Sequence, residues 1–459
     1  MIRTRAESKC PAPKPTPSNT IYLKLRTGDL GLQIGIETPR PSCAGPGGLM
    51  LASILHHNNI PSTIFERDSS AIARAQGGTL DIHEYSGQQA LNAAGLLGKF
   101  RSVMRLGGDA MRILKKDGTV LFEDSGDGES PEASEKQNGE VVGKFVKGRP
   151  EIDRPALKDL LIASLPADTI HWGSKVTSVV PVPDSKKWSI ELDGGSRPAP
   201  FDLVVGADGG WSHTRALLTD QQPFYSGVTA LDVWVHNVDE VAPDVSAFVG
   251  LGNCFLWDTN RALLFQRNGQ GREGDARCYA CIKTEAKAPP SARALLGEED
   301  DGTEVDWNVA RVRERFVERH FGDWFAEVKR ILLSMTETPI LRPLYMLPVG
   351  LTWESRPGAT LVGDAAHLMT PFAGVGVNVA FMDALELAQG IVDCVKAGSA
   401  DGNGLAVMLQ KYEKGMFARS GEEAAKTESA MHLQFLKDGA ERMIMIMSQG
   451  LQPGELVFE

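Results

Sequence analysis

The 459-residue sequence lacks any long uninterrupted apolar stretch. A membrane-spanning helix needs roughly 18 consecutive apolar residues, and no window approaches that length. Basic residues are also few, since 48 Lys and Arg stand against 59 Asp and Glu and give a net charge of -11. Nucleic-acid surfaces depend on clustered basic side chains. We therefore expect no membrane span and no nucleic-acid partner, and a neutral or weakly polar small molecule is the better ligand.

Cysteine is also sparse, with six residues scattered along the chain. A chain of this size needs no disulfide scaffold, so a reducing, cytoplasmic location is expected. Cys278 and Cys281 form a CYAC pair, but ARCYACIKT reads as a strand in which residues three apart point to opposite faces. A shared metal or redox site is disfavoured, and no metal is expected. Residues 1–20 are basic and Pro-rich without an apolar core, which predicts a disordered tail rather than a secretory signal.

Most of the chain repeats a strand, a glycine turn and a helix. STIFERD and DLVVGADGG are short apolar strands, and LMLASILHHN has helical spacing. This alternation predicts a doubly wound, parallel α/β sheet of the Rossmann type. Between about residues 228 and 283, short apolar runs alternate with turn residues and predict an inserted antiparallel sheet. Long helical patterns follow in the C-terminal third.

The stretch PSCAGPGGL resembles a dinucleotide-binding turn without its first glycine. Gly45 and Gly48 take the second and third glycine positions, where backbone approaches a pyrophosphate and helix packs on strand. Cys43 takes the first, and the prolines of ETPRPS cannot continue a central strand. The first strand must therefore end early or loop out. Glu66 ends STIFERD about twenty residues further on, where an acid accepts ribose hydroxyls; a solvated strand end is the simpler alternative.

A second segment, LVGDAAHLMTPFAGVGVNVAFMDALELA, carries a more specific pattern. An apolar strand ends at Gly363, Asp364 follows, and a helix begins near Gly376 after a loop of Pro and Gly. The first turn of a helix presents unpaired N–H groups and the positive end of its dipole, which suits an anion. We expect this segment to bind part of a cofactor.

Three motifs in order identify a family. GDAAHLMTPFAGVGVN resembles the flavin-binding GD motif of class A flavoprotein monooxygenases, the group that includes para-hydroxybenzoate hydroxylase. VVGADGGWSHTR resembles their DG motif, and AGPGGL with ERD resembles their FAD-adenosine site. Within the family the chain most resembles tetracycline-inactivating monooxygenases, through GGTLDIH, GRPEIDR and GDAAHLM. The resemblance implies an FAD-binding domain built from 21–98, 141–222 and 345–400, a substrate domain from 99–140 and 223–344, and a C-terminal helical segment, 401–459.

The resemblance implies roles at the adenosine end of FAD. Glu66 would hold the ribose, with Arg67 beside the adenine. Asp208 would act through the pyrophosphate region, and Arg215 would support it indirectly. Arg74 matches an arginine that contacts NADPH in the tetracycline enzymes.

At the flavin end, Asp81 and Arg149 would bind the cofactor, with Arg149 reaching the pyrophosphate or ribityl chain. Arg149 and Arg154 could instead only cap and pair around the helix PALKDLLIASL. The remaining cofactor residues come from the GD motif: Gly363 would permit close approach, Asp364 would bind a ribityl hydroxyl, and Gly376, Val377 and Asn378 would face the N1 and O2 edge of the flavin.

In such enzymes the cofactor performs the difficult step. The resemblance implies that NADPH reduces FAD, that O2 gives a flavin C4a-hydroperoxide, and that an aromatic, polyketide-like or polycyclic enol is hydroxylated. No protein side chain is assigned as catalytic. His367 and Pro371 are candidates for the cavity wall, although His367 could be a core histidine, and the loop from Pro371 to Gly376 could close over the substrate.

The resemblance is weakest at the residues expected to contact substrate. Asp232 and Thr259 stand where tetracycline enzymes have a glutamine and a histidine, which disfavours tetracycline as substrate. Trp234 and Phe372 would line the cavity, and Asp232, Trp234, Phe255 and Trp257 would form one sheet face for a flat substrate. Strand tryptophans could equally belong to the core.

Two alternatives of function and one of assembly stay open. The interrupted first strand could leave a non-catalytic or FAD-impaired relative that acts as a binding protein. A flavin-dependent reductase or halogenase is less favoured, since no WxWxIP stretch is present. The chain is expected to be a monomer or a weak homodimer.

Overall fold

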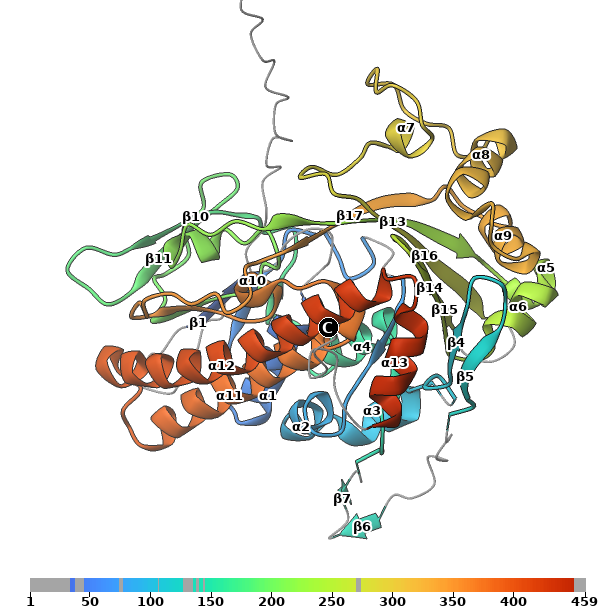
Figure 1. The fold of residues 1–459 in the computed structure, drawn as a ribbon. Helices are drawn as coiled ribbons and strands as arrows, with labels where there is room; N and C mark the ends of the chain where they lie inside the picture. The colour runs from blue at the N-terminus through green and yellow to red at the C-terminus, as the bar shows by residue number, and fades with distance from the viewer. Residues whose placement is uncertain are drawn as a thin grey trace, which may run out of the picture.

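The computed structural model describes residues 34–37, 45–73, 77–105, 107–126, 135–137, 140–142, 145–269 and 274–449. Two large β-sheets lie side by side, and helices cover both (Figure 1). The tail expected at residues 1–20 lies outside these ranges. None of the helices within them has the length and apolar character that crossing a bilayer requires.

The first sheet has five parallel strands. Their order is β18 (Ala359–Leu361), β12 (Leu203–Gly206), β1 (Ile34–Glu37), β2 (Thr63–Phe65) and β9 (Ile170–His171). β12 and β18 are buried along their whole length, as continuous apolar runs predict for strands covered on both faces. The doubly wound, Rossmann-like prediction is confirmed.

The interruption predicted in the first strand falls between that strand and the next helix. β1 ends at Glu37, before Pro39 and Pro41, and it remains paired with β12 and β2. Helix α1 (Pro46–His57) then begins after Gly45. Residues 38–44, with Cys43, lie outside the described ranges.

Helix α1 lies against α11 (Gly376–Lys396), the helix of the GD motif. A Cβ at Gly47 would lie 3.3 Å from the Cβ of Ala380, so a glycine lets the two helices approach closely. Gly48, for which the sequence predicts a packing role, is buried in the same helix. The two glycine-rich motifs are therefore brought together by helix packing.

The second sheet has seven strands. Their order is β17 (Ile340–Met346), β13 (Phe224–Val235), β16 (Asp275–Lys283), β15 (Arg261–Asn268), β14 (Asn253–Asp258), β4 (Met111–Leu114) and β5 (Val120–Asp124). It is mixed rather than purely antiparallel, because β4 pairs in parallel with β14. β4 and β5 come from an earlier part of the chain, so the parallel pair arises where that hairpin joins the later strands.

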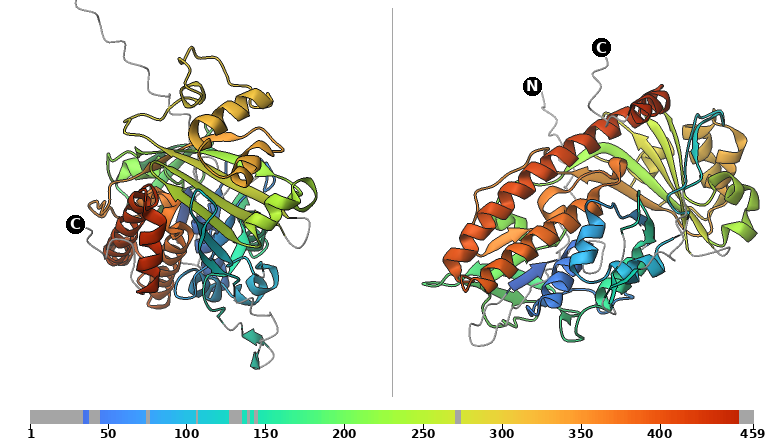
Figure 2. Two further views of the ribbon diagram at one scale, coloured as in Figure 1. Left: turned by 45° about the vertical axis from the view of Figure 1, so that its right-hand side comes forward. Right: turned by 90° about the horizontal axis from the view of Figure 1, so that it is seen from below.

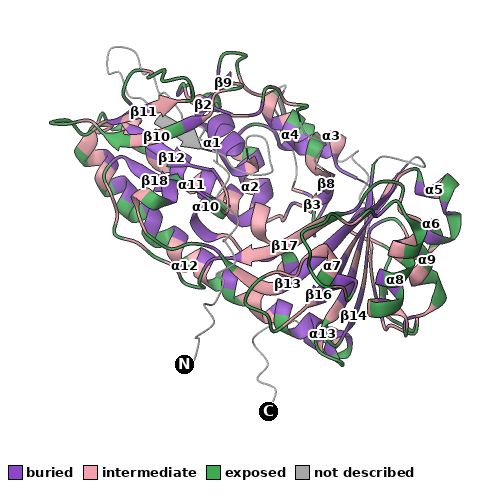
Figure 3. Cartoon of the chain, turned by 90° about the horizontal axis from the view of Figure 1, so that it is seen from above, coloured by how far each residue is buried: buried purple, intermediate pink, exposed green. Residues whose placement is uncertain are grey.

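Alternation along β13 and β16 separates the two faces of this sheet. Leu231 and Val233 pack with Cys278 in one apolar cluster, and Ala230 packs with Cys281 in another. The two cysteines therefore lie on opposite faces, as predicted. Helices α5 (Val238–Val241), α6 (Pro243–Val249), α8 (Ala310–Phe321) and α9 (Ala326–Leu333) cover the first face and present exposed residues outward (Figure 3). The second face is directed toward the five-stranded sheet.

The remaining elements connect and close the two sheets. Helix α12 lies along α11 and reaches the second sheet, where α13 packs against β14 and β5 (Figure 2). The bounds are β3 (Thr79–Asp81), β6 (Glu135–Gln137), β7 (Glu140–Val142), β8 (Glu151–Asp153), β10 (Val176–Pro181), β11 (Trp188–Leu192), α2 (Gly87–Ala93), α3 (Leu97–Val103), α4 (Arg154–Ile162), α7 (Ala292–Leu295), α10 (Asp364–His367), α12 (Gly402–Gln434), α13 (Gly439–Ser448) and the short 3₁₀ helices η2 (Thr214–Leu217) and η3 (Pro371–Ala373).

Candidate functional site

The adenosine end of the expected cofactor site lies at the edge of the five-stranded sheet. Glu66 directly follows β2, is buried, and accepts a hydrogen bond from the backbone N–H of Asp68 at 2.9 Å. Arg67 lies beside it, with Nε 3.8 Å from a carboxylate oxygen of Asp68. Gly45 precedes α1, whose first turn has no side-chain cap. Backbone N–H groups at this helix start thus remain suited to an anion.

The GD motif follows strand β18. Gly363 has a φ of 62°, a conformation that favours glycine, and Asp364 begins α10 directly after it. The Asp364 side chain keeps solvent-exposed surface, yet burial in the surrounding protein raises its pKa, against the opposite effects of His367 and Arg154. The Asp364 carboxyl group is therefore both surrounded by protein and accessible to solvent. Its role toward FAD stays a prediction.

A buried ionic network holds the GD motif from behind. One carboxylate oxygen of Asp383 accepts hydrogen bonds from the Gly363 N–H at 2.9 Å and His367 Nε2 at 2.6 Å, and the other accepts from Arg419 Nη2 at 2.8 Å. Burial lowers the pKa of His367, but Asp383 outweighs it and the net shift is upward. His367 is therefore a buried partner of Asp383, nearer to the core alternative than to a cavity wall.

The predicted flavin loop is fixed to the C-terminal helices. Gln434 at the end of α12 donates a hydrogen bond to the Phe372 carbonyl at 2.9 Å, and the Phe372 ring meets Phe435 edge-on at 5.5 Å. Phe372 itself is buried, while Pro371 at the start of η3 is exposed. The loop is thus held by its middle residue. Closure over a substrate, as the sequence suggested, would have to break these contacts.

The start of α11 is the helix end at which the flavin edge is predicted to lie. Asn378 donates through Nδ2 to the Asp81 carbonyl at 2.9 Å and accepts the His83 N–H at 2.8 Å, so its side chain positions the loop after β3. Gly376 and Val377 begin the helix without a side-chain cap. A Cβ at Gly376 would meet no atom within 4 Å, so open space lies beside this positive helix end.

The DG motif uses its charged residues internally. The Asp208 carboxylate accepts hydrogen bonds from the N–H groups of His213 at 2.6 Å and Thr214 at 3.1 Å. Arg215 is fully buried and donates to the Ala365 carbonyl at 3.0 Å, which ties this turn to α10. Both residues shape the site, in line with the indirect roles predicted for them.

Three residues predicted to contact FAD or NADPH, Asp81, Arg149 and Arg74, have different outcomes. Asp81 accepts from His83 Nε2 at 2.9 Å and lies beside the flavin loop, because a Cβ at Gly374 would come 3.4 Å from its carboxylate. The Arg149 side chain is 61% exposed and only 3.9 Å from Asp81 at its closest nitrogen. Arg74 lies outside the described residues.

Arg154 is half-buried, whereas Arg149 is exposed. Burial lowers its pKa, and Tyr279 and Asp364 are both within electrostatic reach of it. The motif resemblance favoured Arg149 over Arg154. The positions of the two arginines in the chain account for the difference. Arg154 is the first residue of helix α4, directly after strand β8, whereas Arg149 precedes that strand.

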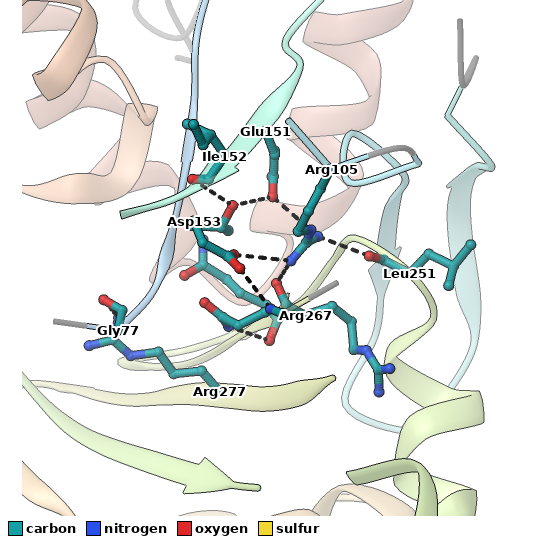
Figure 4. Close-up of polar contacts among 12 residues, drawn as sticks. Gly77, Arg105, Glu151, Ile152, Asp153, Leu251, Arg267 and Arg277 are labelled. Carbon is teal, nitrogen blue, oxygen red and sulfur yellow. Dashed lines mark hydrogen bonds and ion pairs between the residues drawn. The ribbon is translucent and has the colours of Figure 1, made fainter. Parts of the chain in front are cut away.

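A buried polar cluster fixes β8 to the seven-stranded sheet (Figure 4). Glu151 accepts hydrogen bonds from the Thr79 hydroxyl at 2.7 Å and from the Asn253 amide, and Arg105 Nη2 lies 3.5 Å away. Burial raises the pKa of Glu151 to about 7, with Arg105 acting in the opposite direction. Since β8 leads directly into Arg154, this cluster anchors that side chain against the second sheet.

The predicted substrate face is present in the seven-stranded sheet. Asp232 and Trp234, however, do not form its accessible surface. Asp232 is fully buried and accepts from Arg277 at 2.8 and 2.7 Å and from Arg342 at 2.6 Å. Trp234 is held by Gly77, where any Cβ would clash with its ring, and by Arg277, 4.9 Å from the ring centroid. Neither residue can contact a substrate directly without rearrangement.

The accessible surface of this face comes from neighbours in register. Tyr279 pairs with Asp232, Leu264 with Tyr279, and Phe255 with Leu264, so they form one row across adjacent strands. All three side chains of the row are partly exposed. Thr259 instead lies in the exposed turn between β14 and β15 and is not brought into the row. Alternate residues of a strand point to the same face of the sheet. Extending this rule from Asp232 to the neighbouring strands would have identified Tyr279 and Leu264 on the substrate face.

No group of three or more His, Cys, Asp or Glu side chains within the described residues is arranged to hold a metal ion. A surface recess of about 450 Å³ does lie between the end of α11 and the start of α12, lined by Cys394 and Met408 among others, but it is remote from the GD motif. The site is therefore the junction of Glu66, Asp364, the α11 start and the row of Tyr279.

Comparisons with known proteins agree with this geometry. Residues 356–414 match the FAD binding domain family. Monooxygenase asqM of Emericella nidulans is 32% identical over 85% of this chain and 92% of its own length, and monooxygenase penA of Penicillium thymicola is 30% identical over 87% and 96%. The crystal structure of tetracycline destructase Tet(51) covers 88% of this chain and 93% of its own with a TM-score of 0.57 at 19% identity, which is a likeness of fold. The chain therefore belongs to the FAD-binding monooxygenases.

Proposed function

We propose that this monooxygenase uses NADPH and O2 to hydroxylate a flat aromatic, polyketide-like or polycyclic enol. The observation that carries the proposal is that Asp364 of the GD motif and Tyr279 of the sheet row both lie within electrostatic reach of Arg154. Leu264 and Phe255 continue that row in register. The GD motif and the sheet face would thus hold cofactor and substrate against each other. When bound and reduced, FAD would supply the oxygen-activating chemistry.

The residues present fit FAD. Asp364 offers an accessible hydrogen-bonding carboxyl, Gly376 leaves room beside it, and Glu66 lies at the far end for the ribose. The α11 start would stabilise negative charge on the reduced flavin edge through its N–H groups. Nothing in the comparisons supports the alternative of a non-catalytic relative.

On the substrate side, the chain's residues position and shield rather than react. Burial raises the pKa of Tyr279, so its hydroxyl stays protonated at neutral pH and can donate a hydrogen bond to a substrate oxygen. Leu264 and Phe255 would hold the flat body of the substrate and exclude water from it. A protein nucleophile is not needed, because enols and phenols are already nucleophilic at carbon.

The test is the purified protein. We expect a yellow preparation with absorbance near roughly 450 nm, NADPH oxidation stimulated by an aromatic or enolic compound, and a product heavier by one oxygen atom. Asp364→Ala should lose FAD while remaining folded, whereas the exposed control Asp168→Ala should keep it. Colourless protein that added FAD does not reconstitute would contradict the proposal.

A further inference from the structure

Arginine side chains gather where the seven-stranded sheet faces the GD motif. Arg277 uses three nitrogens, two on Asp232 and Nη1 on the Gly77 carbonyl at 2.9 Å. Arg342 binds Asp232 only through Nε. Its two terminal nitrogens have no partner in the part of the chain that the structure describes, and its side chain is 32% exposed. Arg342 therefore offers a free guanidinium edge to a ligand.

A second arginine approaches the same place from the five-stranded side. The backbone N–H of Arg154 donates to the Gly78 carbonyl at 2.9 Å, and the missing side chain of Gly78 makes room for Arg277, with which any Cβ there would clash. The backbone of Arg154 and the side chain of Arg277 thus contact neighbouring glycines, Gly78 and Gly77. No hydrogen bond or ion pair of the Arg154 guanidinium occurs within the described ranges.

Three arginines and three carboxylates act on one another at this place. Arg154, Arg277 and Arg342 lie within electrostatic reach of Tyr279. Asp232 and Glu337 act on Arg277, and Asp364 acts on Arg154, so the three carboxylates offset the three arginines and the unpaired N–H groups, rather than a net charge, distinguish this place. Arg277 makes two of the three hydrogen bonds to the Asp232 carboxylate, and Arg342 makes the third through Nε. The two terminal nitrogens of Arg342 are consequently left for a ligand.

Apolar surface continues from this arginine-lined end. Tyr279 lies beside Asp232 in register, and Leu264 and Phe255 extend the row away from the arginines. A ligand that satisfies both ends has a flat apolar body and one negative group. A planar guanidinium binds two oxygens side by side best, which suits a carboxylate or the delocalised oxygens of an ionised enol.

We propose that the substrate carries one anionic oxygen group that Arg342 binds, with Arg154 opposite, while its flat apolar body lies along Tyr279, Leu264 and Phe255. This inference rests on the proposed function and names the substrate class for it. It replaces the neutral or weakly polar ligand that overall composition suggested, because the unpaired N–H groups of Arg342 are a local feature that the acidic average of the chain does not show.

The experiment measures binding to the FAD-loaded protein by titration calorimetry at neutral pH. The probes are two matched pairs, 2-naphthoate with 2-naphthamide and 4-hydroxycoumarin with 4-methoxycoumarin, in which only the first of each pair is anionic. The pairs distinguish a carboxylate from an ionised enol. We expect at least one anion to bind roughly tenfold or more tightly than its neutral partner, as a charge-assisted hydrogen bond gives.

Variants assign the preference to Arg342. Arg342→Gln should reduce the ratio of anionic-probe to neutral-probe affinity to below roughly threefold without changing the affinity for the neutral probe. Arg342→Lys should retain part of the preference for the anion. The exposed Arg311→Gln is the matched control and should keep the wild-type ratio. Asp232 stays paired with Arg277 in these variants, so the fold is preserved.

Equal binding within both probe pairs, or no binding of either anion, would overturn the inference. A preference for the anion that survives Arg342→Gln would also overturn it. Loss of FAD from Arg342→Gln would assign the arginine to the cofactor instead. NADPH oxidation is measured separately. Anion preference without turnover of any compound would refute the proposed function and leave this inference standing. Turnover of neutral compounds alone would support the proposed function and refute this inference.

Discussion

Replacing Glu151 by glutamine should remove a pH dependence from the stability of the protein. Burial raises the pKa of Glu151 from 4.5 to about 7. The folded state therefore keeps the proton that the unfolded state releases, and the free energy of unfolding falls as pH rises between these two values. From about pH 5 to about pH 8 this group alone lowers stability by about 2 to 3 kcal/mol.

The surrounding groups can accommodate the amide. Thr79 can continue to donate to the side-chain oxygen, and the buried Oδ1 of Asn253, which has no partner within the described residues, can accept from the new amide if the Asn253 side chain turns over. We expect Glu151→Gln to cost little at about pH 5 and to stabilise the protein relative to wild type at about pH 8.

The assay is urea unfolding of the FAD-loaded protein across this range, followed by tryptophan fluorescence. The exposed Glu354→Gln is the matched control and should track the wild type at every pH. Parallel curves for wild type and Glu151→Gln, with a difference that does not grow as pH rises, would refute the reasoning. They would mean that Arg105 keeps the carboxylate charged in the folded protein.

Three further substitutions test other parts of the site. Asp232→Ala leaves Arg277 and Arg342 without their buried counter-charge and should destabilise the fold by about 3 to 5 kcal/mol, measured by urea unfolding; a loss of substrate response alone would contradict this. Gly376→Ala adds a methyl group in open space, so stability should stay within about 1 kcal/mol while FAD affinity drops, measured by fluorescence titration; unchanged affinity would place the flavin elsewhere. Gly78→Ala combines a φ of 100° with a clash against Arg277 and should lower soluble yield and melting temperature, whereas wild-type stability would show that the two sheets can separate there.

The sequence predicts the fold class and the GD motif well, because both depend on local patterns. Apolar runs that end in glycine predict strands β12 and β18. The aspartate and glycines that follow β18 predict the GD motif, because an ordinary strand–loop–helix unit does not require them. The parallel pairing of β4 with β14 was not predictable in the same way. It joins segments more than a hundred residues apart, and a strand's own pattern does not state which edge it pairs with.

The substrate face shows the same limit at the level of single side chains. Alternation places Asp232 and Trp234 on the correct face, yet it cannot tell that arginines from β16 and β17 cover Asp232. Arg342 and Arg154 become visible only when the sheets are brought together, since each lies in an ordinary local pattern. Glu66 and Asp364 follow motif spacing, and their places in the fold agree with it, while their contacts with FAD stay predictions.

The hydrogen bond from Gln434 to the Phe372 carbonyl has a consequence for the order in which the protein is completed. Helix α12 follows every strand of both sheets along the chain, and Arg419 of the same helix also reaches Asp383 behind the GD motif. During synthesis the strands can form and pair before this helix has left the ribosome, because chains fold from the N-terminal side first. The loop and the glycine beside Asp364 acquire their final supports only afterwards. A chain paused before Gln434 would therefore lack the hydrogen bond that holds the Phe372 loop, even if both sheets had already formed.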